Sequence, residues 1–331
     1  MSAGMTTLFG VNVPYLRGEY GHDFAENGRF PTWPCRFDPM HAYRPLIEAR
    51  RMGFRAVRMW LCENGEGIRV DASGRIAGVS ERLLESVRVV QEAAALHGLY
   101  LYFALLDGNS VAREGDPITR SILSDPDQTA RFAERVVAPL VRVLDPALVF
   151  ALDVVNEPET ATAECIDDPA VAPIAWDVVG RAVAAIGDAA RAERAIPITS
   201  GTMHVFLPEL WRAGAELSAV DVHVYHPDGG LPSREDLARY VGDDAILELP
   251  LIGGELGIPK DPGPKEPASL TNYLHNAPRL GYTAAFLWQL EGDLIDKGEP
   301  ARPRTWLGDQ VATTLDQVRR GRLSPDRPDP R

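Results

Sequence analysis

The sequence is poor in cysteine. Its 331 residues contain three cysteines, Cys35, Cys62 and Cys165, which are widely spaced and odd in number. This number and spacing fit neither a disulfide scaffold nor a cysteine-based zinc site. We therefore expect small buried thiols in a reducing compartment.

Positive charge and long apolar runs are also scarce. Lysine and arginine total 34 against 47 aspartates and glutamates, which gives a formal net charge of −13. That balance argues against nucleic acid, polyanions and acidic membrane surfaces as partners, and favours neutral ligands. No apolar run approaches the roughly 20 residues that cross a bilayer. The first seven residues show neither a basic nor an apolar export region, so we expect a cytoplasmic protein.

What the sequence does contain is a regular alternation of strand-like and helix-like segments. Eight strands, each followed by a helical segment, are typical of a single-domain α/β protein of the (β/α)8 TIM barrel type. The predicted strands cover residues 8–13, 54–60, 99–106, 149–155, 196–200, 219–224, 249–254 and 283–288. The predicted helices cover residues 41–52, 80–97, 127–144, 174–191, 207–213, 234–241, 270–279 and 305–320.

Loop lengths support the same fold. Connections into strands are short, while several connections that leave strands are long, so one face of the barrel is built up. We assign residues 1–322 to one catalytic barrel. Residues 323–331, rich in proline and charge, are expected to be a disordered tail.

The fourth predicted strand ends in a polar motif. Its apolar run stops at Asn156-Glu157-Pro158, and Pro158 cannot continue a strand ladder. The carboxyl ends of barrel strands are where active sites form. Asn156 and Glu157 are therefore candidate site residues, although the same residues would also serve simply to end a strand and open a loop.

Further polar and aromatic residues end other strands. Each has a structural alternative, since a tryptophan can be core, an arginine can neutralise buried carboxylates and a histidine can be a hydrogen-bonded core residue. Together with Asn156 and Glu157 they occupy five strand ends, and this coincidence favours a common site. Two carboxylates with a cation and indole rings suit glycoside cleavage, which needs one protonated and one ionised carboxyl group. These residues are Arg58, Trp60, His223, Tyr225, Glu255 and Trp288.

Two stretches resemble signatures of a known enzyme clan. Residues 153–158 (Asp-Val-Val-Asn-Glu-Pro) and 252–257 (Ile-Gly-Gly-Glu-Leu-Gly) look like the two motifs of clan A glycoside hydrolases. Together with Arg58, His223-x-Tyr225 and Trp288, the pattern most resembles glycoside hydrolase family 5, the cellulase and mannanase family. The resemblance extends from Leu8 to about Arg320.

One position departs from the family pattern. Many family 5 members end the third strand in a histidine that lines the sugar site, whereas residues 105–109 here read Leu-Leu-Asp-Gly-Asn. Either Asp107 or Asn109 takes the place of this histidine, or the chain belongs to a divergent subfamily or to another family of the clan.

The resemblance implies a retaining mechanism that uses no cofactor or metal. Glu157 would be the general acid/base, and Glu255 the nucleophile that forms a covalent glycosyl-enzyme. The remaining candidates would bind substrate or hold these two: Asn156 at the hydroxyl next to the reacting carbon, Tyr225 on Glu255, His223 on the acid/base or the sugar, Trp288 as the floor, and Arg58, Trp60, Asp107, Asn109 and Trp33 around them.

Physical chemistry adds two expectations about the two glutamates. Arg58 would favour the ionised form of Glu255, while the neighbouring negative charge and partial burial would keep Glu157 protonated. The two carboxyl groups of a retaining enzyme should lie roughly 5–5.5 Å apart.

Two other readings remain open. A carbohydrate-binding barrel without catalysis would explain the missing histidine. A metal-dependent barrel enzyme, such as a sugar isomerase or phosphoesterase, could use Asp221, His223 and His226, with Asp153 and Glu157 nearby. Against this, Asp221 is expected deep in its strand, and the neighbouring strand ends lack the further histidine or aspartate cluster of such sites.

The substrate is expected to be a low-molecular-weight β-glucoside or β-mannoside. The aromatic residues Tyr15, Trp33 and Trp306 are candidates to build the cleft or to block one end of it.

Overall fold

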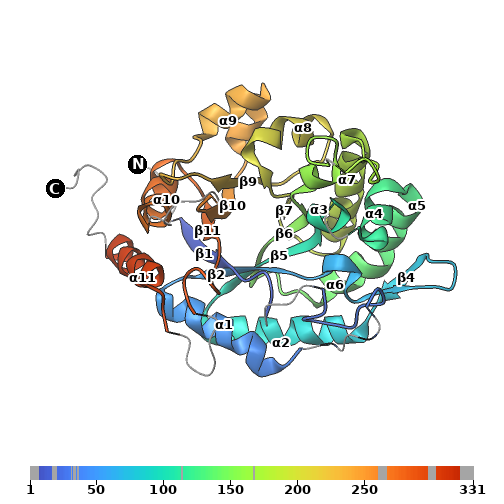
Figure 1. The fold of residues 1–331 in the computed structure, drawn as a ribbon, viewed down its shortest axis with the longest axis horizontal. Coiled ribbons are helices and arrows are strands. Elements are labelled where there is room, and N and C mark those ends of the chain that lie inside the picture. Colours follow the sequence, from blue (N-terminus) through green and yellow to red (C-terminus); the bar gives the residue numbers. More distant parts are fainter. Residues whose placement is uncertain are drawn as a thin grey trace.

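The barrel sheet is parallel throughout and is enclosed by helices (Figure 1). The computed structural model describes residues 7–16, 21–30, 32, 35, 37–112, 115–166, 168–259, 267–296 and 303–320. Trp33 and the predicted tail at residues 323–331 lie outside these ranges.

Nine short strands make up the sheet, in the order β7-β6-β5-β2-β1-β11-β10-β9-β8. β7 and β8 are consecutive pieces of one strand position, because β7 pairs with β6 and β8 pairs with β9. The chain therefore has eight strand positions and closes as the predicted (β/α)8 barrel. The strands are β1 Leu8–Asn12, β2 Ala56–Trp60, β5 Tyr100–Asp107, β6 Val149–Asn156, β7 Ile198–Thr199, β8 Thr202–Met203, β9 Val220–Tyr225, β10 Leu251–Gly257 and β11 Ala284–Leu287.

The break between β7 and β8 falls at Ser200 and Gly201. A Cβ atom at Gly201 would lie 2.4 Å from Nε2 of His223, so this position admits only glycine without a shift. The Gly201 carbonyl accepts a hydrogen bond from Glu157 N at 2.7 Å, and its N–H donates to Asp153 Oδ1 at 3.1 Å. The strand is thus interrupted at the residue whose backbone hydrogen-bonds Asp153 and Glu157, at the end of the neighbouring strand β6.

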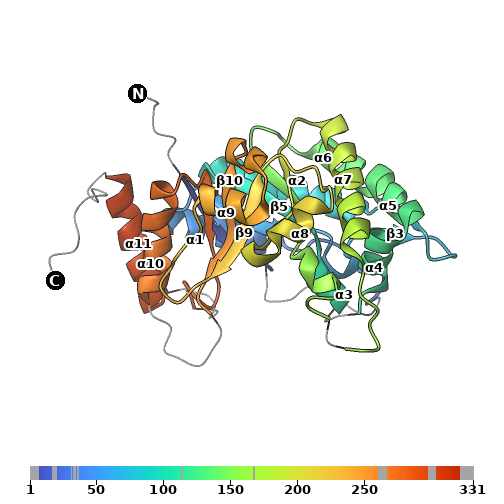
Figure 2. The same ribbon diagram turned by 90° about the horizontal axis from the view of Figure 1, so that it is seen from above.

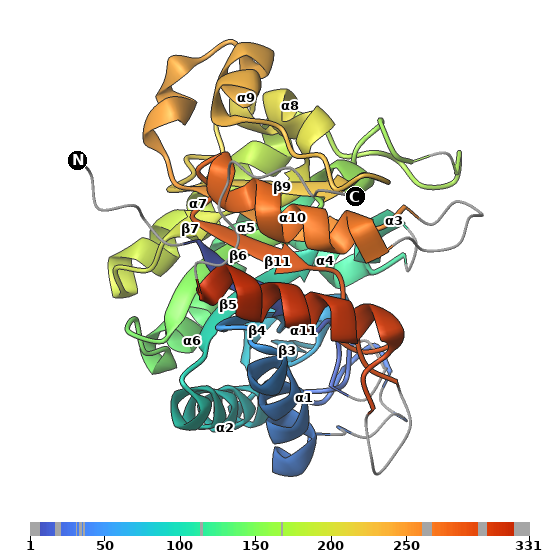
Figure 3. The ribbon, with the colours of Figure 1, turned by 90° about the vertical axis from the view of Figure 1, so that its left-hand side faces the viewer.

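The helices surround the sheet, as Figure 3 shows for α10 and α11, which lie side by side outside β11. Sequence signals set several ends: Ser80 accepts a hydrogen bond from Leu83 N at the start of α2, and Gly98 ends it in a left-handed conformation. The larger helices are α1 Pro39–Met52, α2 Glu81–His97, α4 Pro117–Ser124, α5 Pro126–Phe132, α6 Ala138–Val143, α7 Trp176–Glu193, α8 Leu207–Arg212, α9 Arg234–Val241, α10 Pro267–Arg279 and α11 Trp306–Arg319.

One predicted helix is divided. Residues 127–144 form α5, a π-helical turn at Ala133–Val137 and α6. Pro139 has no N–H to donate to the carbonyl four residues earlier, and a wider turn accommodates that missing bond.

The sequence did not predict several short elements in the loops that leave strands. A hairpin of β3 Ile68–Val70 and β4 Ile76–Val79 follows β2, and α3 Gly108–Ala112 follows β5 directly. The 3₁₀ turn η3, Pro158–Ala161, follows β6. Figure 2 shows α3 and the connection before α7 projecting on one side of the barrel.

The core has two parts. Inside the barrel, small side chains pack around Tyr102 and Phe286, and a larger apolar layer lies between the sheet and the helices. Within the described ranges, no helix combines the length and apolar character needed to cross a membrane.

Candidate active site

Glu157 stands at the turn that ends β6. Its backbone is left-handed (φ 45°, ψ 58°), a conformation that costs energy for a residue with a Cβ atom. The hydrogen bond from its N–H to Gly201 O helps hold that turn, and Pro158 begins η3 immediately afterwards. The prediction that Pro158 ends the strand is confirmed.

Glu255 lies on β10 and is buried. Arg58 Nη1 donates to its Oε1 at 2.8 Å, and the Tyr225 hydroxyl donates to its Oε2 at 2.7 Å. The β9–β10 register shifts between Gly253 and Glu255, a bulge of the kind that redirects side chains next to active sites. Gly254 is required there, because a Cβ atom would lie 2.4 Å from Asp221 Oδ1.

The two glutamates face one another across His223. One carboxylate oxygen of Glu157, one of Glu255 and a His223 ring nitrogen all lie within 4.8 Å of each other. His223 Nδ1 is 3.2 Å from Glu157 Oε1 and 3.9 Å from Glu255 Oε2. This separation fits the roughly 5–5.5 Å of a retaining pair better than the roughly 6.5–9.5 Å of an inverting pair.

Arg58 organises the floor of the site and is fully buried. Besides Glu255, its guanidinium donates to Asp153 Oδ2 at 2.5 Å, Asn156 Oδ1 at 2.7 Å and Asn12 Oδ1 at 3.1 Å. A buried guanidinium of this kind needs such acceptors, because an unpaired buried charge is costly. Arg58 therefore binds the ends of four strands together.

Two tryptophans form one wall. The rings of Trp60 and Trp288 meet edge to face, with centroids 5.8 Å apart at 84°. Arg58 stacks on the Trp60 ring at 4.4 Å, so Trp60 is held by packing. Trp288 is partly exposed and lines the pocket, as expected of a surface on which a sugar ring could stack.

Asp107 and Asn109 lie beside Asn156 and Glu157. Asp107 Oδ1 accepts from Asn156 Nδ2 at 3.1 Å and from Asn109 Nδ2 at 3.1 Å. Asn109 Nδ2 also donates to Glu157 Oε2 at 3.0 Å. Asp107 is the last residue of β5 and Asn109 lies in α3; that they take the place of the absent histidine stays a prediction.

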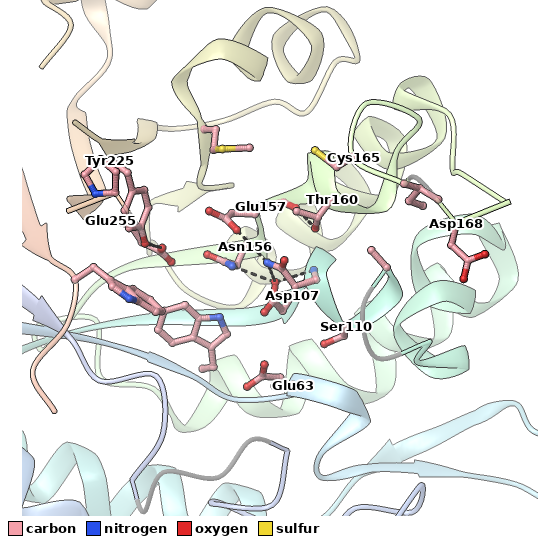
Figure 4. A pocket seen from close by; sticks show the side chains of 17 residues that line it. Glu63, Asp107, Ser110, Asn156, Glu157, Thr160, Cys165, Asp168, Tyr225 and Glu255 are labelled. Atoms are coloured by element: carbon pink, nitrogen blue, oxygen red, sulfur yellow. Dashed lines mark hydrogen bonds between the residues drawn. The ribbon is translucent and has the colours of Figure 1, made fainter. Parts of the chain in front are cut away.

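The pocket that these residues line has a volume of about 630 Å³, within the range of small-molecule sites. In Figure 4, Tyr225 and Glu255 lie at one end, Asp168 lies at the other, and Asp107, Asn156 and Glu157 lie between them. The remaining lining residues are Trp60, Glu63, Asn109, Ser110, Ala112, Thr160, Cys165, Ile166, Met203, Pro259 and Trp288.

The protonation states of Glu157 and His223 differ from the expectation. Burial alone would lower the pKa of His223, but the negative charge of Glu255 and the hydrogen bond to Glu157 raise this pKa to about 9. Burial would raise the pKa of Glu157, yet the hydrogen bond and charge of His223, with smaller contributions from Asn109 and Arg58, lower it to about 2. The expectation of a protonated Glu157 in the free site was wrong, because His223 takes up the proton.

The pKa values of two further carboxyl groups that line the pocket, Glu255 and Asp107, are raised. Burial raises the pKa of Glu255, the charge of Glu157 adds to this, and His223 and Arg58 oppose it. Burial likewise raises the pKa of Asp107 to about 6, against the hydrogen bond from Asn156. As expected, Arg58 acts to lower the pKa of Glu255, but burial raises this pKa by more.

The structure brings the predicted site residues together at the pocket, with the exception of Trp33. Trp33 lies outside the described residues, and the others surround the pocket or, like Arg58 and His223, support it. Tyr15 and Trp306 are not among the described residues that line the pocket, and Trp306 is exposed on α11.

Sequence reasoning missed three buried supports. Asn12 and Asp153 bond Arg58, and Glu159 accepts from Met203 N and Thr202 Oγ1 at 2.8 Å each. The available signal for Asn12 and Asp153 was a polar residue inside an apolar strand.

Within the described ranges, two groups of side chains have the ligand types and spacing of a metal site. They are Asp153, Asp221 and His223, and Glu157, His223 and Glu255. Arg58 already bonds Asp153 and Glu255, and a divalent cation would have to share this buried space with its guanidinium. The donor sets therefore fit an arginine-centred network better than a metal centre.

The fold and the site together define a (β/α)8 barrel with paired carboxylates at the carboxyl ends of its fourth and seventh strand positions. Known structures with this fold include a β-1,4-mannanase from the sea hare Aplysia kurodai, with 16% identity, TM-score 0.71, and coverage of 96% of this chain and 93% of that chain. An endo-1,4-β-mannanase from Eisenia fetida has 17% identity and a TM-score of 0.72, and the match covers 98% of this chain and 94% of that chain. GH5_18 from Streptomyces cattleya in complex with Manβ1-4GlcNAc has 18% identity and a TM-score of 0.68, with coverage of 98% of this chain and 83% of that chain.

Sequence comparison adds one curated relative, a mannan endo-1,4-β-mannosidase of Mytilus edulis. It is 23% identical over 154 residues, which cover 46% of this chain and 40% of that protein. No family model matches the chain. These likenesses support the resemblance to glycoside hydrolase family 5 that the two motifs indicated.

Proposed function

We propose that this protein is a retaining β-glycosidase that cleaves neutral β-linked glycosides or short oligosaccharides. The observation that carries the proposal is the approach of Glu157 and Glu255 to within 4.8 Å, with Nδ1 of His223 beside both of them. A single anomeric carbon fits between two carboxylates at this spacing. No observation favours the non-catalytic alternative.

In the first step, Glu255 acts as the nucleophile. Its carboxylate oxygen forms a bond to the anomeric carbon while the glycosidic bond breaks. Glu157 passes a proton to the departing oxygen. Because the proton rests on His223 in the free site, we propose that it moves to Glu157 along their 3.2 Å contact.

In the second step, water replaces the leaving group. Glu157, now a carboxylate, takes a proton from this water as its oxygen attacks the anomeric carbon and releases Glu255. Arg58 and Tyr225 hydrogen-bond the two oxygens of Glu255 and so stabilise the carboxylate as it leaves. The sugar keeps its β configuration after these two displacements.

The preferred substrates are β-mannosides. The structural neighbours include β-mannanases and an exo-β-1,4-mannosidase from an Opitutaceae bacterium, and one neighbour holds Manβ1-4GlcNAc. The pocket is lined by Glu63, Asp107 and Asp168 in addition to the two proposed catalytic glutamates, and it would repel glycosides of uronic acids. Neutral sugars fit this surface.

The test is hydrolysis of aryl β-mannosides and β-glucosides, with the first-formed product followed by ¹H NMR. We expect β-mannose to appear first and to mutarotate afterwards. An α-anomer appearing first, or no turnover of any β-glycoside or manno-oligosaccharide, would refute the proposal.

The pH dependence provides a separate prediction. Hydrolysis requires one proton on the His223–Glu157 pair, and this pair loses it near the His223 pKa of about 9. We therefore expect kcat/KM for a substrate with a poor leaving group to fall as pH rises through about 9. The measurement is kcat/KM from pH 5 to 10.5, with stability checked by circular dichroism. A basic limb near the ordinary histidine pKa of about 6.5 would contradict the proposed proton location.

The cytoplasmic location expected from the sequence stays a prediction, as does the absence of nucleic-acid and membrane partners.

A further inference from the structure

The end of β5 approaches the acid/base turn unusually closely. A Cβ atom at Gly108 would lie 2.3 Å from the Glu157 carbonyl oxygen and 2.6 Å from Thr160 Oγ1. Only glycine lets α3 pack against η3 at this distance. This contact brings the next residue, Asn109, directly beside the Glu157 side chain.

Asn109 is held in one orientation by Asp107. Asp107 Oδ1 accepts both the backbone N–H of Asn109, at 2.9 Å, and its side-chain amide, at 3.1 Å. The same Nδ2 donates to Glu157 Oε2 at 3.0 Å. Nδ2 lies between two carboxylate oxygens, which accept hydrogen bonds, so the amide presents its N–H donors to both of them.

We propose that Asn109, locked by Asp107, is a positioning residue for the acid/base Glu157 in place of the strand-three histidine of family 5. This inference rests on the proposed function for the role of Glu157, but its geometry does not. The Glu157 carboxylate is fixed at both oxygens, by His223 at Oε1 and by Asn109 at Oε2.

The amide N–H of Asn109 determines in which direction the pKa of Glu157 changes when Asn109 is lost. An amide N–H stabilises the ionised carboxylate, so loss of Asn109 should make Glu157 easier to protonate. The other groups that face Glu157 remain: Arg58 on β2, Asp107 on β5, His223 and Tyr225 on β9, and Glu255 on β10, with Glu159 on η3. In the free site Glu157 is ionised both before and after His223 loses its proton, so the pH of that loss should change little when a neutral donor to Glu157 is removed.

The kinetic test compares Asn109→Ala with the wild type on two aryl β-mannosides. A dinitrophenyl leaving group needs little protonation, whereas a weakly acidic phenol depends on the acid. We expect kcat/KM to fall roughly tenfold for the poor leaving group, because Glu157 Oε2 loses the contact that fixes its position, and to change little for the activated one. Equal losses on both substrates would mean that Asn109 binds sugar instead, and would overturn the inference.

The second test needs no activity. The His223 imidazole is titrated by ¹⁵N NMR in the wild type, Asn109→Ala and Asn109→Asp. We expect the midpoint in Asn109→Ala to stay close to that of the wild type, because Glu157 is ionised on both sides of this titration. It should rise by roughly one pH unit in Asn109→Asp, which keeps the shape of the residue but places a second carboxylate beside the His223–Glu157 pair.

Asn276→Ala is the matched control. It also removes an asparagine amide hydrogen bond, from Nδ2 to Gly229 O at 2.9 Å, and Asn276 does not line the pocket among the described residues. Its His223 titration should match that of the wild type. If Asn109→Asp also matches the wild type, residue 109 does not act on the His223–Glu157 pair and the inference is wrong. A wild type that titrates as expected but hydrolyses nothing would instead count against the proposed function.

Discussion

Replacing Glu255 with alanine should reduce kcat by a factor on the order of 10⁵ or more, the scale seen when a hydrolase loses its nucleophile. Glu255 is the carboxylate held on both oxygens, by Arg58 and Tyr225, and it is the group proposed to bond the anomeric carbon. Hydrolysis of an aryl β-mannoside, followed by absorbance, measures the loss.

Added azide distinguishes Glu255→Ala from the acid/base variant Glu157→Ala. Azide can enter the space of the lost Glu255 side chain and attack the anomeric carbon from that face, which yields the α-glycosyl azide. In Glu157→Ala, azide attacks the glycosyl-enzyme from the opposite face and yields the β-glycosyl azide. ¹H NMR of the product identifies the face, and exchanged product configurations would show that the two roles are reversed.

Glu157→Ala should be less severe and should depend on the leaving group. General acid catalysis contributes typically about 10²- to 10⁴-fold, so the loss should reach this size for poor leaving groups and be small for dinitrophenyl. Glu48→Ala, which removes a partly exposed glutamate of α1 that pairs with Arg51, is the control and should keep full activity. If Glu157→Ala and Glu48→Ala behave alike, the site assignment fails.

The largest effect on stability is expected for Arg58→Met. Methionine has a similar volume but leaves Asp153 and Glu255 buried without their cation. Breaking a buried ion pair from one side costs about 3–5 kcal/mol. Urea unfolding at pH 7, followed by circular dichroism, should show this decrease in the free energy of unfolding.

Arg181→Ala is the matched control for Arg58→Met. Arg181 and Asp177 form an exposed ion pair at 2.8 Å on α7, and such pairs contribute about 0–1 kcal/mol. Adding Asp153→Asn to Arg58→Met should recover part of the stability, because it removes one of the two uncompensated charges. Equal free energies of unfolding for Arg58→Met and the wild type would contradict the role given to Arg58.

Local sequence patterns were enough to predict the barrel. Each strand position is a short apolar run bounded by turn residues, and capping signals such as Ser80 and Gly98 mark helix ends within a residue or two. Because the carboxyl ends of parallel strands lie at one face of a barrel, the order of the strands also indicated that Glu157 and Glu255 lie at the same end of it.

Short elements and shared backbone contacts were not predictable in this way. Residues 198–203 contribute to two strand pairings because Gly201 packs against His223, a contact between residues 22 positions apart in sequence. The short helix α3 forms where Gly108 can approach Glu157, which no local periodicity encodes. Such features depend on distances across the barrel.

The sequence by itself determined the fold class, the two glutamates and the ring of polar and aromatic residues at the strand ends. Only the tertiary structure decided their charges. A pKa depends on burial and on neighbours within a few ångströms, so the placement of His223 between Glu157 and Glu255 moved the proton away from the residue that the sequence had assigned to carry it.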